Sequence, residues 1–206
     1  FGNHEPLGLG DMSEAKGDIP GTREGRPGHP EGTHVNGHDM DIGYYQINQP
    51  NNYLRSICEH MVNGRDQYHC TEAPEFLDVW RTALFLGVMH HSPQLRVIGV
   101  DGRAGEMIDA AMDQLCAAGY LDGPACNARS RALAFEVEDT GRGWFRFHHH
   151  HFHISLSDRR SAGLANISLA PVAGADACLR ADCAPVEHPE HGHGLPNISL
   201  PRVELH

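Results

Sequence analysis

The sequence lacks several features that would point to common classes of protein. No apolar stretch is long enough to cross a membrane, so we expect no membrane span. No Cys-x-x-Cys pair is present, which argues against a zinc ribbon. Basic side chains are few, because 16 Lys and Arg stand against 27 Asp and Glu, a formal net charge of −11. We do not expect a chain this acidic to bind a nucleic-acid backbone as its main partner.

The start of the chain also lacks an initiator methionine and an apolar signal segment. We therefore expect a mature exported protein or a trimmed chain. The six cysteines form three pairs that are close in sequence: Cys58 with Cys70, Cys116 with Cys126, and Cys178 with Cys183. This pattern favours disulfides formed in an oxidising compartment, with free thiols or a thiolate metal site as alternatives. We expect a periplasmic or secreted protein.

The composition predicts one domain with irregular ends. Hydrophobic residues make up 40% of the 206 positions, and 23 Gly and 13 Pro indicate long segments without regular structure. We predict a domain over residues 1–160, of which residues 1–33 are irregular. Residues 161–206 are predicted to be a Pro/His-rich C-terminal extension, in which a His-rich segment could bind metal weakly but is better explained as a solvated tail.

Apolar spacing predicts an α+β fold with a small antiparallel β-sheet flanked by helices. Helices are expected over residues 53–62, 74–90 and 107–119, and strands over residues 39–45, 95–100, 132–138 and 144–155. The Gly-containing turn at residues 139–143 favours a hairpin between the last two strands. The second helix is expected to bury a stripe formed by Phe76, Trp80, Leu84, Gly87 and Val88.

A run of histidines dominates residues 144–155. Four histidines occupy positions 148–151, and His153 follows after one phenylalanine. The run is internal and flanked by aromatic and β-branched residues, unlike a purification tag. In a strand, His149, His151 and His153 would share one face, because side chains alternate. Several imidazoles on one face favour a metal site over a plain surface strand.

A second strand carries carboxylates. From residue 39, Met40 and Ile42 alternate with Asp39 and Asp41, which share the opposite face. Acidic residues form strands poorly, so a metal or a buried hydrogen-bond network is needed to explain them. Asp39 is either an orienter of a ligand histidine or a solvated or capping carboxylate.

These segments together offer a catalytic metal site. Three protein ligands and one open position are typical of catalytic zinc, and the chain offers His34, Asp41 and His153. His151 lies two residues before His153 and is placed to act as general base. His90 and His91 could also be ligands, but at a helix end they are more often capping cations.

Two motifs resemble the LAS metallopeptidases, which include lysostaphin-type enzymes, D-alanyl-D-alanine carboxypeptidases and penicillin-insensitive murein endopeptidases. The motifs are His34-x-x-Gly37-x-Asp39-x-Asp41-Ile42 and His148-x-x-His151-Phe152-His153-Ile154, with Trp144 and Arg146 ahead of the second, as in the murein endopeptidase branch. The resemblance implies that His34, Asp41 and His153 bind zinc. It also implies that His151 is the base and that His148 steadies the substrate or the oxyanion.

The chain departs from the murein endopeptidase pattern at two positions. Glu31 stands where a further histidine is usual, so either His29 substitutes for it or that substrate contact is absent, and His38 follows Gly37 in place of an apolar residue. Strict alternation also puts His148 on the face opposite His151, unless the strand begins near residue 149 or contains a bulge.

The leading hypothesis is a zinc-dependent endopeptidase that hydrolyses amide bonds in peptidoglycan cross-links. The alternatives are a zinc peptidase with protein or peptide substrates, and a non-catalytic metal-binding module on the same fold.

Overall fold

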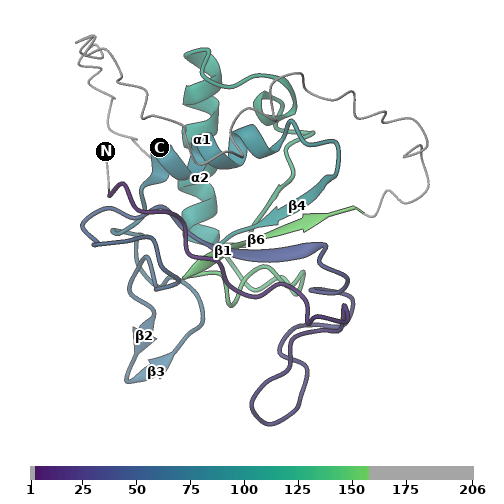
Figure 1. Ribbon diagram of the computed structural model, residues 1–206. Helices are drawn as coiled ribbons and strands as arrows, with labels where there is room; N and C mark the ends of the chain where they lie inside the picture. Colours follow the sequence, from purple (N-terminus) through teal and green to yellow (C-terminus); the bar gives the residue numbers. More distant parts are fainter. Residues whose placement is uncertain (1–2, 158–206) are drawn as a thin grey trace, which may run out of the picture. The chain divides into compact units, whose positions relative to one another are not determined.

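The computed structural model describes residues 3–157, so the predicted extension at 161–206 and the Cys178–Cys183 pair lie outside the described part. The main sheet has the order β1-β6-β4-β5 (Figure 1). Its strands are β1 (Asp39–Gly43), β4 (Leu95–Gly99), β5 (Leu133–Ala134) and β6 (His151–Leu156). The other elements are β2 (Met61–Val62), β3 (Arg65–Asp66), α1 (Val79–Met89), α2 (Gly102–Ala117) and the 3-10 helix η1 (Gly123–Cys126). Among residues 3–157, no helix has the length and apolarity to cross a membrane.

The mixture of helices and strands agrees with the predicted α+β class, but the sheet is not purely antiparallel. β6 pairs antiparallel with both β1 and β4, whereas β5 pairs parallel with β4. The predicted hairpin between residues 132–138 and β6 is therefore wrong, because β4 lies between them. Two features explain this. α2 and η1 supply the long crossover that a parallel pair requires, and Glu136 accepts hydrogen bonds from the N–H groups of Arg142 and Trp144, which folds the turn around its carboxylate.

The register of β1 against β6 separates two chemically different faces. Met40 lies opposite Ile154 and Ile42 opposite Phe152, whereas Asp41 lies opposite His153. The apolar face joins a core with both helices, and Figure 1 shows α1 and α2 on the same side of the sheet. The buried cluster includes Ile42, Ile98, Phe152 and Ile154 from the sheet and Ala83, Leu86, Ile108 and Met112 from the helices. The Asp and His side chains therefore occupy the face opposite the helices.

Both helices begin at aspartate caps. Asp78 accepts a hydrogen bond from the N–H of Arg81, so α1 begins after it and not at Pro74. The predicted stripe of α1 is correct only in part: Gly87 is buried and Trp80 packs partly buried against the core, but Leu84 is 40% exposed and Val88 is 54% exposed. The buried residues are Val79, Thr82, Ala83, Leu86 and Gly87. Gly87 lies against Leu121, and a Cβ there would overlap that side chain. In α2, Ile108, Ala111, Met112 and Leu115 are buried.

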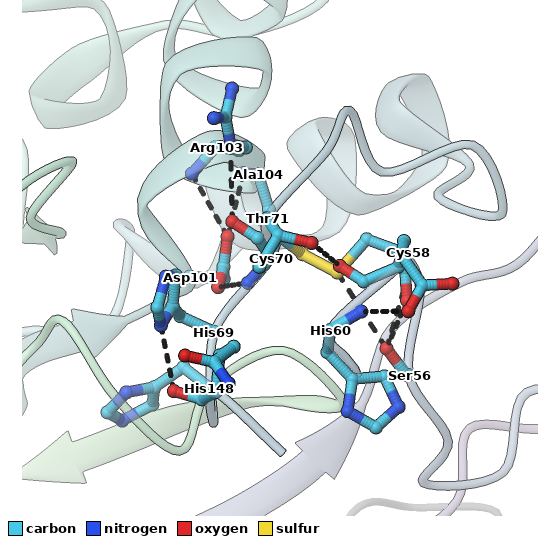
Figure 2. Close-up of a disulfide and its surroundings, with 12 residues drawn as sticks. Ser56, Cys58, His60, His69, Cys70, Thr71, Asp101, Arg103, Ala104 and His148 are labelled. Carbon is cyan, nitrogen blue, oxygen red and sulfur yellow. Dashed lines mark hydrogen bonds between the residues drawn. A yellow bond between two sulfur atoms is a disulfide. The ribbon is translucent and has the colours of Figure 1, made fainter. Parts of the chain in front are cut away.

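The predicted helix at residues 53–62 does not form. Ile57 is buried in a loop, where its N–H donates to His149 O and its carbonyl accepts from Phe76 N–H. The predicted disulfides Cys58–Cys70 and Cys116–Cys126 are both present. Figure 2 shows the first of them beside the N-terminal end of α2, where Cys70 N–H donates to the Asp101 carboxylate at 2.8 Å. The chain between the two cysteines forms the short β2–β3 ribbon in place of a helix.

The N-terminal segment has no helix or multi-residue strand within residues 3–33, as predicted. It nevertheless runs along the outer edge of β1. Gly10 N–H donates to Asp41 O at 2.8 Å, and Asp41 N–H donates to Asp11 O at 2.9 Å. These hydrogen bonds protect the sheet edge and carry Met12 to the His34 side chain.

Candidate metal centre

Three of the predicted site residues come together on the polar face of the sheet. We call His34, Asp41 and His153 the sheet cluster. Nε2 of His34 lies 3.2 Å from Nδ1 of His153 and 3.4 Å from Oδ1 of Asp41, and the third distance, between His153 Nδ1 and Asp41 Oδ1, is 3.0 Å. All three residues are buried. The β1–β6 register sets the Asp41–His153 pair, and the loop before β1 brings in His34.

The backbone before β1 folds sharply to place His34. His34 and Asn36 have positive φ values of 53° and 55°, and Gly37 follows with φ 69°. Left-handed conformations at three of four positions turn the chain back over the strand. The N–H of His34 then donates to Oδ2 of Asp39 at 3.0 Å, which fixes the loop to β1.

The hydrogen bonds at the outer nitrogens assign one proton to each histidine, although Nδ1 of His153 also faces a carboxylate, Oδ1 of Asp41, at 3.0 Å. Nδ1 of His34 lies 3.0 Å from Met12 O, and a carbonyl can only accept, so Nδ1 carries the proton. Nε2 of His153 lies 3.1 Å from Oδ1 of Asp39, so it donates to that carboxylate. His34 Nε2 and His153 Nδ1 therefore face each other and Asp41; burial opposes a charge on His34, but Asp41 and the Met12 carbonyl raise its pKa, so a proton occupies this position when no cation does.

This arrangement fits a bound cation. Three acceptor atoms converge here, so a positive charge, carried by a proton or by a metal ion, is needed among them. Ligand atoms about 2.0–2.1 Å from a tetrahedral zinc ion are about 3.3 Å apart, close to the observed separations. Burial works against a charged Asp41, but hydrogen bonds from His153 and His34 outweigh it and lower the pKa of Asp41 below its ordinary range. The donor set is therefore suited to zinc.

Asp39 combines the two roles that the sequence left open. Its Oδ1 accepts from His153 Nε2, and its Oδ2 accepts from the backbone N–H of His34. Ser155 donates to the same Oδ1, and Nη2 of Arg96 lies 3.6 Å from it. One carboxylate therefore orients the ring of His153 and caps the turn that carries His34.

His151 and His148 lie beside the sheet cluster. Nε2 of His151 is 3.5 Å from Oδ1 of Asp41, and the ring centroids of His148 and His151 are 5.4 Å apart. His148 precedes β6 and follows Phe147, whose φ is 74°, so the alternation of the strand does not govern it. Burial lowers the pKa of His151 well below its ordinary value and lowers the pKa of His148 to about 4. Both imidazoles are therefore neutral near pH 7.

Trp144 packs against this group from the β4 side. Its ring lies 5.4 Å from the ring of His148 and 6.0 Å from that of His153, centroid to centroid. Gly99 is opposite His153 in the β4–β6 register, and a Cβ there would overlap the Trp144 ring. The sequence prediction missed Gly99, although a glycine inside a strand is itself a signal of close approach.

The N-terminal segment brings in His29, which the sequence offered as a substitute at the position of Glu31, and adds Asp11 and Met12, which the sequence prediction did not place. The His29 ring stacks on the His34 ring at 3.7 Å, and His29 Nε2 lies 3.0 Å from Oδ2 of Asp11. One ligand atom each from His29, His34 and Asp41 lie within 4.8 Å of one another. Glu31 is exposed. The segment showed no periodicity, so nothing in its sequence indicated that Asp11 and Met12 reach the site.

The remaining helix-end histidines are not part of the centre. Nδ1 of His90 lies 2.8 Å from Leu86 O, and its Nε2 accepts from Ala132 N–H at 2.9 Å. His90 is thus a buried neutral link between α1 and the start of β5, and burial lowers its pKa. His91 is exposed and lies 3.1 Å from Asp122.

A cavity of about 340 Å³ lies next to the Cys58–Cys70 disulfide, away from the sheet cluster. Its lining includes Asp101, Arg103, Glu106 and Glu136, and none of the three sheet-cluster residues contributes to it. The convergent donor atoms, and not cavity volume, therefore define the candidate centre.

Comparison of the sequence with protein-family models and with curated proteins found no match to either.

Proposed function

We propose that this protein is a zinc-dependent endopeptidase that hydrolyses amide bonds in peptidoglycan cross-links. The observation that carries the proposal is the convergence of His34 Nε2, Asp41 Oδ1 and His153 Nδ1 at 3.0–3.4 Å, beside the neutral imidazole of His151. The choice of peptidoglycan rests on the resemblance of the two motifs to the LAS metallopeptidases.

The three sheet-cluster residues would hold the zinc ion and leave one coordination position for water or substrate. When bound, zinc polarises the scissile carbonyl and makes a water molecule acidic enough to react near neutral pH. Asp39 keeps Nε2 of His153 protonated, so that Nδ1 stays available as a ligand atom.

His151 transfers the proton. Its low pKa keeps it neutral, so it accepts a proton as the water oxygen attacks the carbonyl carbon. Asp41, 3.5 Å away, stabilises the imidazolium that forms. The same proton then passes to the leaving nitrogen when the C–N bond breaks, and a carboxylate and an amine are released. The neutral ring of His148 donates an N–H hydrogen bond to the developing oxyanion.

The compartment follows from the disulfides and the substrate. Two disulfides within residues 3–157 fit an oxidising compartment. A peptidoglycan substrate then places the protein in the periplasm or outside the cell.

The test compares purified peptidoglycan sacculi with an unfolded protein as substrates for the zinc-loaded full chain. We expect cross-linked muropeptides to be converted to monomers, measured by liquid chromatography and mass spectrometry. His151→Ala should keep its zinc while the rate falls by about 10²–10⁴. His91→Ala, which removes an exposed histidine, is the control and should change neither quantity.

Each other result supports a different function. Cleavage of the unfolded protein alone identifies a protein or peptide endopeptidase. A full zinc complement without hydrolysis of either substrate identifies a non-catalytic metal-binding module. Unchanged turnover in His151→Ala removes His151 from its role as the base.

A further inference from the structure

A second group of metal-ligand side chains lies on the loops next to the main sheet. His60 precedes β2, Asp66 lies in β3 and His149 precedes β6, and we call these residues the loop cluster. One ligand atom from each lies within 4.8 Å of the others. We propose that the loop cluster is a second binding site, for a divalent transition-metal ion. This proposal does not depend on the peptidase function.

The geometry of the cluster is well defined. Nδ1 of His60 lies 3.1 Å from Oδ1 of Asp66, and the ring centroids of His60 and His149 are 4.7 Å apart with an angle of 31° between the rings. Asp66 Oδ1 also accepts from Tyr68 N–H at 2.7 Å, which holds the carboxylate in place. A small shift of the side chains would let one ion bind all three.

His149 supplies an independent indication of a ligand. The residue is only 4% exposed, yet Nδ1 has no hydrogen-bond partner within residues 3–157. A buried imidazole nitrogen without a partner costs free energy, and coordination of a metal ion relieves such a cost. The sequence placed His149 on the strand face of His151 and His153, but β6 begins only at His151, and the bonds of the sheet cluster do not use His149.

The loop that carries His60 and Asp66 is fixed before any ion binds. The Cys58–Cys70 disulfide closes it, and Figure 2 shows His60 on this loop near the disulfide. Gln67 N–H donates to His60 O at 2.9 Å, and Ile57 N–H donates to His149 O at 3.0 Å. The second of these bonds holds the base of the loop against the histidine run. The three ligands are therefore positioned by a covalent link and by backbone hydrogen bonds.

The donor set indicates the kind of ion. Two imidazoles and one carboxylate suit Zn²⁺, Co²⁺, Ni²⁺ or Cu²⁺, whereas Ca²⁺ and Mg²⁺ prefer oxygen ligands. The side chains of His60 and Asp66 are 27% and 33% exposed, so a bound ion exchanges with solvent. A bound ion would link the β2–β3 ribbon to the segment that precedes β6. His150 and His151 follow in that segment, and their rings stack at 4.6 Å.

The test counts bound Zn²⁺ by equilibrium dialysis and mass spectrometry on the full chain. His188, His191 and His193 are replaced by Ala in every protein, so that histidines near the C-terminus do not contribute. This background should bind two equivalents. His60→Ala and Asp66→Asn should each bind one, and the Asn keeps an acceptor for Tyr68 N–H. Asp41→Ala should also bind one, and Asp41→Ala combined with His60→Ala should bind none.

A matched control tests whether any exposed His–Asp pair would give this result. His91 lies 3.1 Å from Asp122, much as His60 lies 3.1 Å from Asp66. His91→Ala should keep both equivalents. The proposal is overturned if His60→Ala binds as much Zn²⁺ as the background, or if His91→Ala loses the same equivalent. Loss in His60→Ala but not in Asp41→Ala would support the loop cluster and contradict the zinc assignment of the sheet cluster.

Discussion

The sheet cluster and the loop cluster have the same ligand types, two histidines and one aspartate, but different supports. In the sheet cluster, His34, Asp41 and His153 are 1%, 3% and 6% exposed, and paired strands position two of the three. In the loop cluster, a disulfide-closed loop carries two partly exposed ligands and only His149 is buried. Burial predicts tight, slowly exchanging metal in the first and weaker, exchangeable metal in the second.

The surroundings of the two clusters differ as much as their burial. Asp39 and Met12 O accept hydrogen bonds from the sheet-cluster histidines, and His151 stands within 3.5 Å of Asp41. The loop cluster is held by Tyr68 N–H and by the disulfide. The ligand sets of the two clusters are alike, whereas the orienting groups and the neighbouring imidazole of His151 are found at the sheet cluster, for which we propose hydrolysis.

The largest expected effect comes from removing a sheet-cluster ligand. Asp41→Ala and His153→Ala should each lose the tightly bound zinc. Zinc affinity should fall by more than the about 10–100-fold that is typical when a hydrogen-bond partner of a ligand is changed. Hydrolysis should fall below detection. Zinc content and muropeptide release measure this. If both variants keep zinc and activity, the sheet cluster is not the catalytic site.

Removing the Cys58–Cys70 disulfide should separate the two clusters. The bond closes a loop with a sequence separation of 12, so replacing both cysteines by Ser should lower the free energy of unfolding by about 2–4 kcal/mol. It should also abolish metal binding at the loop cluster while zinc remains at the sheet cluster. Urea unfolding and metal counting give the two readouts.

The second disulfide is the matched control. Cys116–Cys126 has a separation of 10 and joins α2 to η1, away from both clusters. Its removal should lower stability by a similar amount and leave both metal equivalents in place. Loss of the loop-cluster metal here as well would mean that general destabilisation, and not loop closure, explains the effect.

Asp39→Asn should have a smaller and local effect. The change weakens the acceptor for His153 Nε2 and should reduce zinc affinity at the sheet cluster by about 10–100-fold. Affinity at the loop cluster should not change. Competition with a chelator measures both, and Asp122→Asn is a control on an exposed carboxylate that also faces a histidine. Equal affinity in Asp39→Asn and the wild type would remove Asp39 from its orienting role.

The smallest expected effect is the pH dependence of the metal-free protein. Burial lowers the pKa of both His148 and His149 to about 4, against about 6.5 in the unfolded chain. Between these values the unfolded chain binds more protons, so stability is present above about pH 6.5 and is lost as pH falls. Each histidine should contribute a loss of about 1 kcal/mol between pH 7.5 and about 5.5.

Replacing His148 or His149 by Gln should remove the contribution of that histidine to the loss of stability at low pH. Urea unfolding at the two pH values, with a chelator present, measures this. His91→Gln is the control and should leave the pH dependence unchanged. A full pH dependence in both buried-site variants would contradict the assignment.

Local signals in the sequence predicted much of the sheet cluster. Alternation located β1 and put Asp39 and Asp41 on one face, and the histidine run located β6. Helical spacing located α2, and short cysteine spacing gave both described disulfides. These features depend on residues close in sequence, or on two strands whose motifs were recognised together.

The missed features depend on contacts between distant residues. Ile57 and Cys58 belong to the apolar pattern that predicted a helix over residues 53–62. The hydrogen bond from Ile57 N–H to His149 O and the disulfide between Cys58 and Cys70 hold them in a loop instead. β5 pairs in parallel with β4 after a crossover connection, whereas the sequence predicted that it forms a hairpin with the strand that follows it. The face of the sheet on which His148 lies depends on the positive φ of Phe147. A bulky residue such as phenylalanine gives no sequence signal for this conformation.

Anomalous scattering from zinc-loaded crystals, recorded on both sides of the zinc absorption edge, tests the central claim most directly. We predict an anomalous-difference peak for zinc at about 2.0–2.2 Å from each of three atoms: Nε2 of His34, Oδ1 of Asp41 and Nδ1 of His153. An empty sheet cluster, or zinc bound only at the loop cluster, would contradict the account.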